Sequence, residues 1–347
     1  MASGTGSLRP RSAVGRLSVL GVMHRLTALR WPLVGRASEL DRLGEIALAS
    51  SRGGVVIAGP AGVGKTRLAR EVLEMAARHG LETATASASE SAATIPLGAL
   101  SPLLPPMPHH RAPAELLRQA RAAIAERGRG GRLALLVDDA HRLDDMSATV
   151  VCQLASGGDA FVIATVRSEA QAPDAVVALW KDEIAERVEL RPLPVSSVED
   201  PLNTVLGGNI DAGTLRRFTE VSGGNPMFLR ELVLAACENQ LLQKENGLWR
   251  LVGPLAVSSR LVEIVTARLT RLEAPERAAL EHGQSDGQRR ELEARGGNDR
   301  RTARCPAGAV HRPAVAGAAP LRPRLLRPRE TLRDQVLALR AVRHGSR

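Results

Sequence analysis

Residues 53–80 read GGVVIAGPAGVGKTRLAREVLEMAARHG, and this stretch decides the fold class. The apolar run Gly53–Ala58 predicts a buried strand, and Lys65–His79 carries apolar residues at helical spacing before Gly80 ends the pattern. Between them, Gly59–Thr66 matches the pattern G-x-x-x-x-G-K-[ST]. A glycine-rich loop that follows a strand and opens a helix predicts a phosphate-binding loop (P-loop).

The chemistry of such a loop predicts a bound ATP or ADP. Backbone N–H groups of the loop and the N-terminus of the following helix favour phosphate. The Lys65 ammonium is expected to reach the β- and γ-phosphates, and the Thr66 hydroxyl to ligate Mg²⁺. The predicted nucleotide-binding residues of this loop are Gly59, Pro60, Ala61, Gly62, Val63, Gly64, Lys65, Thr66 and Arg67.

A second apolar strand, Leu133–Val137, ends in Asp138 and Asp139. With a phosphate loop upstream, Asp138 is expected to hold Mg²⁺ together with Thr66. Asp139 is expected to orient or deprotonate an attacking water, which makes it a candidate catalytic residue beside Lys65. The alternative is an ordinary acidic turn after a strand. His141 follows closely, and a hydrogen bond within the loop is expected for it.

The segment Phe161–Ser168 reads FVIATVRS and predicts a further strand. Parallel strands end at one edge of a sheet, so Thr165 and Arg167 are candidates for sensing the γ-phosphate. An arginine leaving a strand is also commonly a solvated side chain, and the sequence leaves both possibilities open.

Short apolar runs alternate with helical patterns through residues 52–191, which predicts an α/β fold with a parallel sheet flanked by helices. After Val195 the strands thin out, and residues 196–240 predict several short helices that form a helical lid. Asn225-Pro226 is a helix start, and Asn246-Gly247 predicts a hairpin turn. The other predicted elements are strands over 82–87 and 187–190, a connector over 96–113, and helices over 114–126 and 261–272.

The net charge of +10 is concentrated at the two ends of the chain. Residues 1–36 carry +6 and residues 281–347 carry +8, so the 244 residues between them carry −4. A DNA footprint is expected on a folded basic face, and the body of this chain is acidic. Three cysteines without ligand spacing indicate a reducing, cytoplasmic setting. No apolar run reaches the ~18 residues that span a membrane.

Three further segments carry a resemblance to a known family. They are PLVGRASEL at 32–40, DDAHRLD at 138–144 and GGNPMFLREL at 223–232. Together with the phosphate loop they resemble the signal-transduction ATPases (STAND class, AAA-like), and in particular the ATPase part of large LuxR-type transcriptional regulators. The resemblance covers about residues 31–280.

The resemblance implies roles for residues outside the loop. Val34, Gly35 and Arg36 would lie against the adenine and ribose, Asn225 and Pro226 would touch the nucleotide from the lid, and Arg167 would be a sensor. Members of the family use ATP/ADP exchange with slow hydrolysis as a switch. Their ATP form self-associates in response to an inducer, which this sequence does not identify, and a C-terminal helix-turn-helix binds DNA.

The domain organisation expected from these patterns has four parts. Residues 1–30 form a basic, disordered extension, 31–195 the ATPase core, 196–280 the helical lid, and 281–347 an Arg/Pro/Ala-rich tail. Two interpretations of the tail stand: a disordered basic segment, or a stretch read in a shifted frame. Neither supplies a recognisable DNA-reading helix, so DNA binding by this chain itself is not predicted.

Two other functions fit part of the sequence. One is a non-hydrolysing, ATP/ADP-gated interaction module. The other is an origin-recognition-like AAA ATPase acting on DNA, against which the acidic body argues. A P-loop kinase is the least expected, because no acceptor-site motif stands out.

Overall fold

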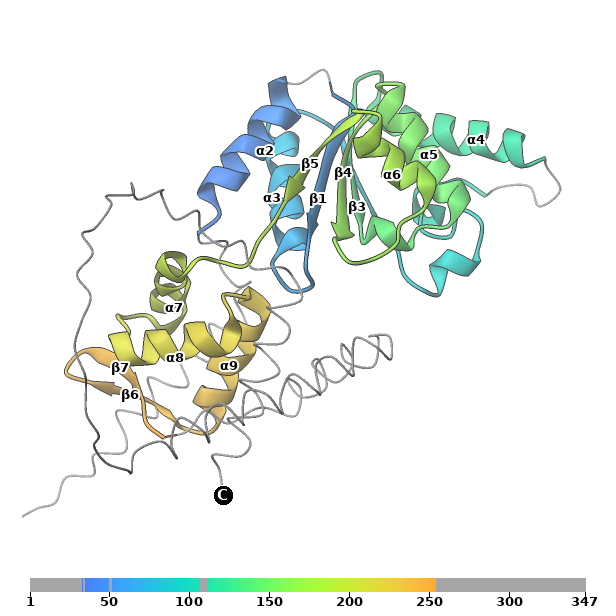
Figure 1. The fold of residues 1–347 in the computed structure, drawn as a ribbon. Helices are drawn as coiled ribbons and strands as arrows, with labels where there is room; N and C mark the ends of the chain where they lie inside the picture. Colours follow the sequence, from blue (N-terminus) through green and yellow to red (C-terminus); the bar gives the residue numbers. More distant parts are fainter. Residues whose placement is uncertain (1–32, 34, 50–51, 107–111, 254–347) are drawn as a thin grey trace, which may run out of the picture. The chain divides into compact units, whose positions relative to one another are not determined.

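The computed structural model describes residues 33, 35–49, 52–106 and 112–253. A five-stranded sheet forms the centre of residues 37–189 (Figure 1). Its strands are β1 (Gly54–Gly59), β2 (Thr83–Ser87), β3 (Leu133–Asp138), β4 (Ala160–Arg167) and β5 (Ala185–Glu189). The helices beside it are α2 (Ala37–Ala49), α3 (Lys65–Arg78), α4 (Pro113–Ala125), α5 (Asp145–Ser156) and α6 (Asp174–Lys181).

All paired strands of the sheet are parallel, and their order is β2-β3-β4-β1-β5. The predicted α/β fold with a parallel sheet flanked by helices is therefore confirmed. In the register of β1 and β4, Gly59 lies opposite Arg167. Because every strand runs the same way, the carboxyl ends of β1, β3 and β4 meet at one edge, where α/β sheets place their sites.

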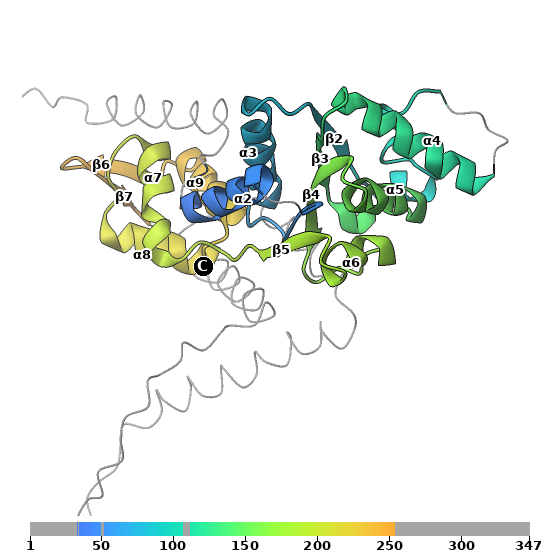
Figure 2. The same cartoon turned by 90° about the horizontal axis from the view of Figure 1, so that it is seen from above.

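Alternating strand residues pack against different helices. Val55 and Ile57 of β1 belong to the core under α2 and α3, whereas Val56 and Ala58 belong to the core that α4, α5 and α6 cover. Figure 2 shows α2 and α3 on one side of the sheet and α4, α5 and α6 on the other. Strands buried on both faces lose the polar alternation of a half-exposed strand, which explains the continuous apolar runs in the sequence.

Residues 199–253, which we name the lid segment, contain three helices and a hairpin. These are α7 (Glu199–Leu206), α8 (Ala212–Ser222), α9 (Pro226–Glu238), β6 (Leu242–Glu245) and β7 (Leu248–Leu251). Asn225 caps α9, as predicted, with its side chain accepting the Met227 N–H at 3.1 Å. Asn246 and Gly247 join the antiparallel strands with φ angles of 50° and 83°, so the predicted hairpin is also confirmed.

Three helices, α2, α5 and α6, were not given bounds from the sequence, although helical patterns were expected between the strands. For α5 a signal was present: the Asp144 carboxylate accepts the Ser147 N–H at 2.9 Å, an ordinary N-terminal cap. The predicted helix over 261–272, the extension over 1–30 and the tail over 281–347 lie outside the described residues and stay predictions.

The packing predicts that two isoleucines contribute very differently to the free energy of unfolding. Ile163 of β4 is fully buried, whereas the Ile95 side chain is 57% exposed. Ile163→Ala is expected to lower the free energy of unfolding by about 2–5 kcal/mol, because it removes buried methylenes and leaves a cavity. Ile95→Ala is expected to change it by less than about 0.5 kcal/mol. Urea denaturation of the full chain measures both, and equal effects would contradict the assigned core.

Candidate functional site

The predicted phosphate loop joins β1 to α3 at the carboxyl edge of the sheet (Figure 1). Gly62 and Gly64 adopt φ angles of 81° and 101°, which L side chains rarely adopt. A Cβ atom on Gly64 would meet no atom within 4 Å, so the backbone angle alone requires glycine there. Val63 between them is buried in the core, so only its backbone is free to contact a ligand.

Lys65 lies under this loop with 7% of the residue exposed. Its Nζ donates to the carbonyl oxygens of Gly59 and Pro60, at 2.9 and 2.8 Å. Burial, together with the nearby Arg167 guanidinium, lowers the pKa of Lys65 to about 8, while Asp139 opposes the shift. A partly desolvated ammonium in this position gains from any anion placed beside it.

The Asp138 carboxylate links the residue at the end of the phosphate loop to strands β3 and β4 through hydrogen bonds. Asp138 Oδ1 accepts hydrogen bonds from the Thr66 hydroxyl at 2.8 Å and from the Thr165 hydroxyl at 2.7 Å. Thr165 is fully buried, and its oxygen also accepts the Asp139 N–H at 2.8 Å. The structure thus brings together the two predicted magnesium ligands, Thr66 and Asp138. The Thr165 hydroxyl contacts both carboxylate residues, and its suggested role as a phosphate sensor stays a prediction.

Asp139 lies at the turn after β3 with φ 53° and ψ 41°, a left-handed conformation that is unusual for a residue with a side chain. Its side chain is 33% exposed, with Oδ1 3.9 Å from Nδ1 of the buried His141. Burial lowers the pKa of His141 to about 4, so the imidazole is neutral near pH 7. Nδ1 has no hydrogen-bond partner in the described part of the chain, so the loop hydrogen bond expected for His141 is absent at this atom.

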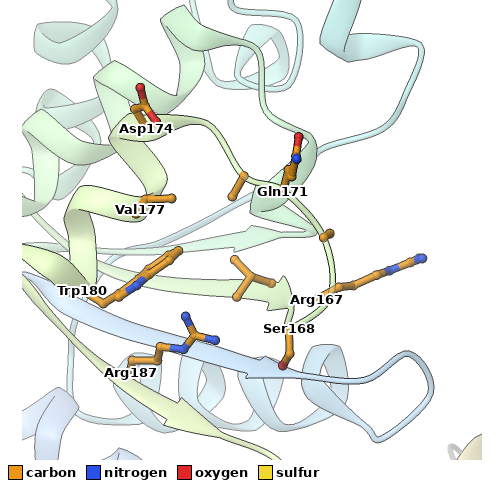
Figure 3. A pocket seen from close by; sticks show the side chains of 10 residues that line it. Arg167, Ser168, Gln171, Asp174, Val177, Trp180 and Arg187 are labelled. Carbon is orange, nitrogen blue, oxygen red and sulfur yellow. The ribbon is translucent and has the colours of Figure 1, made fainter. Parts of the chain in front are cut away.

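Arg167 ends β4 beside the loop, and the Ser168 N–H donates to the Gly59 carbonyl at 3.3 Å. Arg167 also lies at the rim of a cleft of about 410 Å³ between the end of β4 and α6. In this cleft the Arg187 guanidinium carbon lies 4.9 Å from the centroid of the Trp180 ring. Figure 3 shows the Arg167 side chain extending away from these two residues. No residue of the phosphate loop lines the cleft.

The entry segment before α2 is fixed to the end of the sheet. Arg36 is 5% exposed; its guanidinium donates to Glu39 Oε1 at 2.6 Å and to the Arg191 carbonyl. Gly35 has φ 76°, and a Cβ there would lie 2.9 Å from Ser197 Cβ. Val34 lies outside the described residues. The contact of residues 34–36 with a base stays a prediction.

The lid segment reaches the phosphate loop directly. Asn225 Nδ2 donates to the Ala61 carbonyl at 3.0 Å, and the Met227 N–H donates to the Gly62 carbonyl at 3.3 Å. Pro226, predicted to touch the nucleotide, lies between these two residues at the first position of α9. Its contact with a nucleotide stays a prediction.

Arg67 follows the loop motif on the first turn of α3. Its guanidinium pairs with the Glu71 carboxylate one turn further along the helix, at 2.5 Å. A charge already paired along the helix contributes less to a phosphate than the Lys65 ammonium does. Its predicted role in nucleotide binding therefore rests on its backbone N–H.

The residues at this edge fit a magnesium nucleotide. The first turn of α3 has no side-chain cap, so its N–H groups are available to phosphate oxygens. Lys65 supplies positive charge beside them. The Thr66 hydroxyl and the Asp138 carboxylate lie in contact and are the hard oxygen ligands that Mg²⁺ prefers.

Two functional features escaped sequence reasoning. Thr165 was recognised as a strand-end residue, but its bridge between Asp138 and the Asp139 N–H depends on the pairing of β3 with β4. The contact of Asn225 with Ala61 spans 164 residues, and no local pattern indicates it. In both cases the signal lies in tertiary packing.

Comparison with protein families agrees with this geometry. The model of the AAA ATPase domain family matches residues 32–163. The match includes the entry segment, the phosphate loop, Asp138 and Asp139. Residues 32–163 therefore resemble an AAA-type ATPase domain, and the parallel sheet with its strand–loop–helix unit is the P-loop NTPase fold. No curated protein matches the chain.

Solved structures similar to the chain include three at low identity. A RuvB variant of Thermotoga maritima is 16% identical, with TM-score 0.42, covering 76% of this chain and 80% of that one. Domain III of the replication initiation protein DnaA of Thermotoga maritima is 15% identical, with TM-score 0.43 and coverages of 61% and 86%. A chain of the HORMA:CdnC:Trip13 complex of E. coli MS115-1 is 17% identical, with TM-score 0.37 and coverages of 59% and 78%.

Within the described ranges, the helices are all too short or too polar to cross a membrane.

The Thr165 bridge predicts a measurable loss of stability. Thr165→Val keeps the shape of the side chain but removes the hydroxyl that serves Asp138 and the Asp139 N–H. The free energy of unfolding is expected to fall by about 1–3 kcal/mol, because two half-buried polar groups lose their partner. Thr165→Ser, which keeps the hydroxyl, is expected to lower the free energy of unfolding by less. Thermal unfolding compares them, and a valine variant as stable as wild type would refute the bridge.

Proposed function

We propose that this chain is an ATP-binding switch protein that hydrolyses ATP slowly. The observation that carries the proposal is the hydrogen bond of 2.8 Å between the Thr66 hydroxyl and Asp138. It brings the last residue of the phosphate-loop motif to the acidic end of β3, with the Lys65 ammonium beside them. This combination of oxygen ligands, cation and uncapped helix N-terminus suits a nucleoside triphosphate better than any other ligand class.

The roles of the residues follow from their positions. Backbone N–H groups within residues 61–67 and the Lys65 ammonium would bind the phosphates. A magnesium ion held by Thr66 and Asp138 would neutralise developing charge on the phosphates. Asp139 would orient the attacking water and accept its proton, and Arg167 would contact the γ-phosphate. Catalysis would consist of positioning and charge stabilisation, without a covalent intermediate.

The proposal extends to the wider setting of the domain. We take residues 31–195 as the ATPase core and 196–280 as its lid, within a signal-transduction ATPase of the LuxR-type regulator lineage. The motifs at 32–40, 138–144 and 223–232 support this assignment. The ATP form would self-associate. A cytoplasmic location fits both ATP supply and the free thiols of Cys152 and Cys237.

Binding and hydrolysis are expected to respond differently to two substitutions. Lys65→Ala removes the cation and is expected to weaken ATP binding at least about 10-fold, the range of a lost charge-assisted hydrogen bond. Asp139→Asn is expected to leave ATP affinity within about twofold and to lower kcat by about 10²–10⁴-fold, the contribution of a general base. Calorimetric titration and phosphate release measure the two quantities.

The exposed Asp145, at the start of α5, provides the matched control. Asp145→Asn changes the same charge near the site without touching the loop, and both quantities are expected to stay at wild-type values. Equal phosphate release by wild type and Asp139→Asn would overturn the role of Asp139. ATP binding with no release by either protein would favour the non-hydrolysing ATP/ADP-gated module.

Magnesium removal tests the proposed metal ligands. In wild type, chelation of Mg²⁺ by EDTA is expected to weaken ATP binding by about 10-fold or more, since a hard cation held by Thr66 and Asp138 would offset the negative charge of the phosphates. Asp138→Asn is expected to bind ATP weakly with or without Mg²⁺, whereas Asp145→Asn keeps the wild-type dependence. A wild-type affinity that is insensitive to EDTA would contradict a magnesium site at Thr66 and Asp138.

A further inference from the structure

Asn225 uses both ends of its side chain. The Oδ1 atom accepts the N–H groups of Met227 and Phe228, at 3.1 and 3.5 Å, and so caps α9. The Nδ2 atom donates to the Ala61 carbonyl at 3.0 Å. The residue is 2% exposed. A cap alone needs only the acceptor, so the donated hydrogen bond is an additional contact between α9 and the phosphate loop.

The loop and the start of α9 are in close contact at Gly62. A Cβ atom there would lie 2.8 Å from Asn225 Oδ1 and 2.9 Å from Met227 Cε. The Gly62 carbonyl accepts the Met227 N–H at 3.3 Å. Two successive loop carbonyls, those of Ala61 and Gly62, are therefore held by the first residues of the α9 segment.

Because of peptide-bond geometry, a contact that holds a loop carbonyl also orients the N–H of the next residue. In a trans peptide the C=O and the N–H of the next residue point in opposite directions, and none of the described peptide bonds is cis. Holding the Ala61 carbonyl toward α9 therefore turns the Gly62 N–H away from α9. The Gly62 carbonyl fixes the Val63 N–H in the same way. These are loop N–H groups that the proposed function assigns to phosphate binding.

The start of α9 is itself fixed to the segment after β5. The Leu193 N–H donates to the Gly224 carbonyl at 2.8 Å, and a Cβ on Gly224 would lie 2.1 Å from the Leu193 carbonyl oxygen. Gly224 has φ 70°, which leaves no alternative residue without strain. Asn225 is thus held in place on one side while it holds the loop on the other.

We propose that Asn225 is a positioning residue of the nucleotide site, which sets the orientation of the Ala61–Gly62 and Gly62–Val63 peptides and couples phosphate binding to the N-terminus of α9. This inference rests on the proposed nucleotide function. Phosphates that bind the Gly62 and Val63 N–H groups polarise the same peptides whose carbonyls α9 holds, so each contact strengthens the other. Loss of the Asn225 donor is expected to weaken nucleotide binding even though α9 remains capped.

The test compares two substitutions of the same kind at two helix caps. Asn225→Ser keeps a capping hydroxyl for α9 but is too short to reach the Ala61 carbonyl. Asp211→Ser makes the matched change at the cap of α8, where Asp211 accepts the Gly213 N–H at 3.0 Å. In the full chain, Asn225→Ser is expected to bind ATP about 3- to 10-fold more weakly, the range of one lost hydrogen bond. Asp211→Ser is expected to bind ATP like wild type.

Hydrogen exchange provides a readout that a merely structural role would not change. Addition of ATP to wild type is expected to slow exchange of the Met227 and Phe228 amides, and this protection is expected to be absent in Asn225→Ser. Asn225→Asp, which keeps the acceptor and loses the donor, is a second variant if the serine protein does not fold. Like the serine variant, Asn225→Asp is expected to bind ATP more weakly than wild type and to show no ATP-dependent protection of these amides.

The outcomes separate the two proposals. If wild type binds no ATP, the proposed function fails. If wild type binds ATP, but Asn225→Ser and Asn225→Asp bind it equally well and show the same protection of α9, only the positioning role of Asn225 fails. Equal losses in Asn225→Ser and Asp211→Ser would also overturn it, because the effect would then follow from capping in general.

Discussion

The Asp138 carboxylate is the contact on which the site depends. By accepting hydrogen bonds from Thr66 and Thr165, it joins the helix after the phosphate loop to the ends of β3 and β4. The parallel order of the sheet makes this possible, since β3, β4 and β1 lie side by side and end at one edge. The same oxygens are placed to hold a cation.

Much of the fold could be predicted from the sequence, because buried strands read as apolar runs. Strands β1, β3 and β4 and helix α3 were located to within about two residues, since both faces of the sheet are covered and the loop motif fixes where β1 ends. Helices α2, α5 and α6 were not given bounds, because none of them follows a sequence motif of the kind that fixes α3. The Asp144 cap marks the start of α5.

The sequence predicted those parts of the site that are formed by residues close together in the chain. The motif placed Lys65 and Thr66 in the loop, and the end of the apolar strand placed Asp138 and Asp139. The Thr165 bridge and the Asn225 contact with Ala61 link residues 27 and 164 positions apart. Such contacts depend on strand pairing and on the packing of the α9 N-terminus against the phosphate loop, which no local sequence pattern predicts. Together they indicate that the loop is shaped from both sides, by β3 and β4 through Asp138 and by α9 through Asn225.

The central claim is that a magnesium nucleotide binds at the phosphate loop. The most direct measurement is a crystal structure of the chain grown with Mg²⁺ and a non-hydrolysable ATP analogue. The account predicts phosphates against the N–H groups of residues 62–66, with the Lys65 ammonium moved from the Gly59 and Pro60 carbonyls onto a phosphate oxygen. It also predicts a metal ion at Thr66 and Asp138. An analogue bound elsewhere, for example beside Trp180, or no bound nucleotide at saturating concentration, would contradict it.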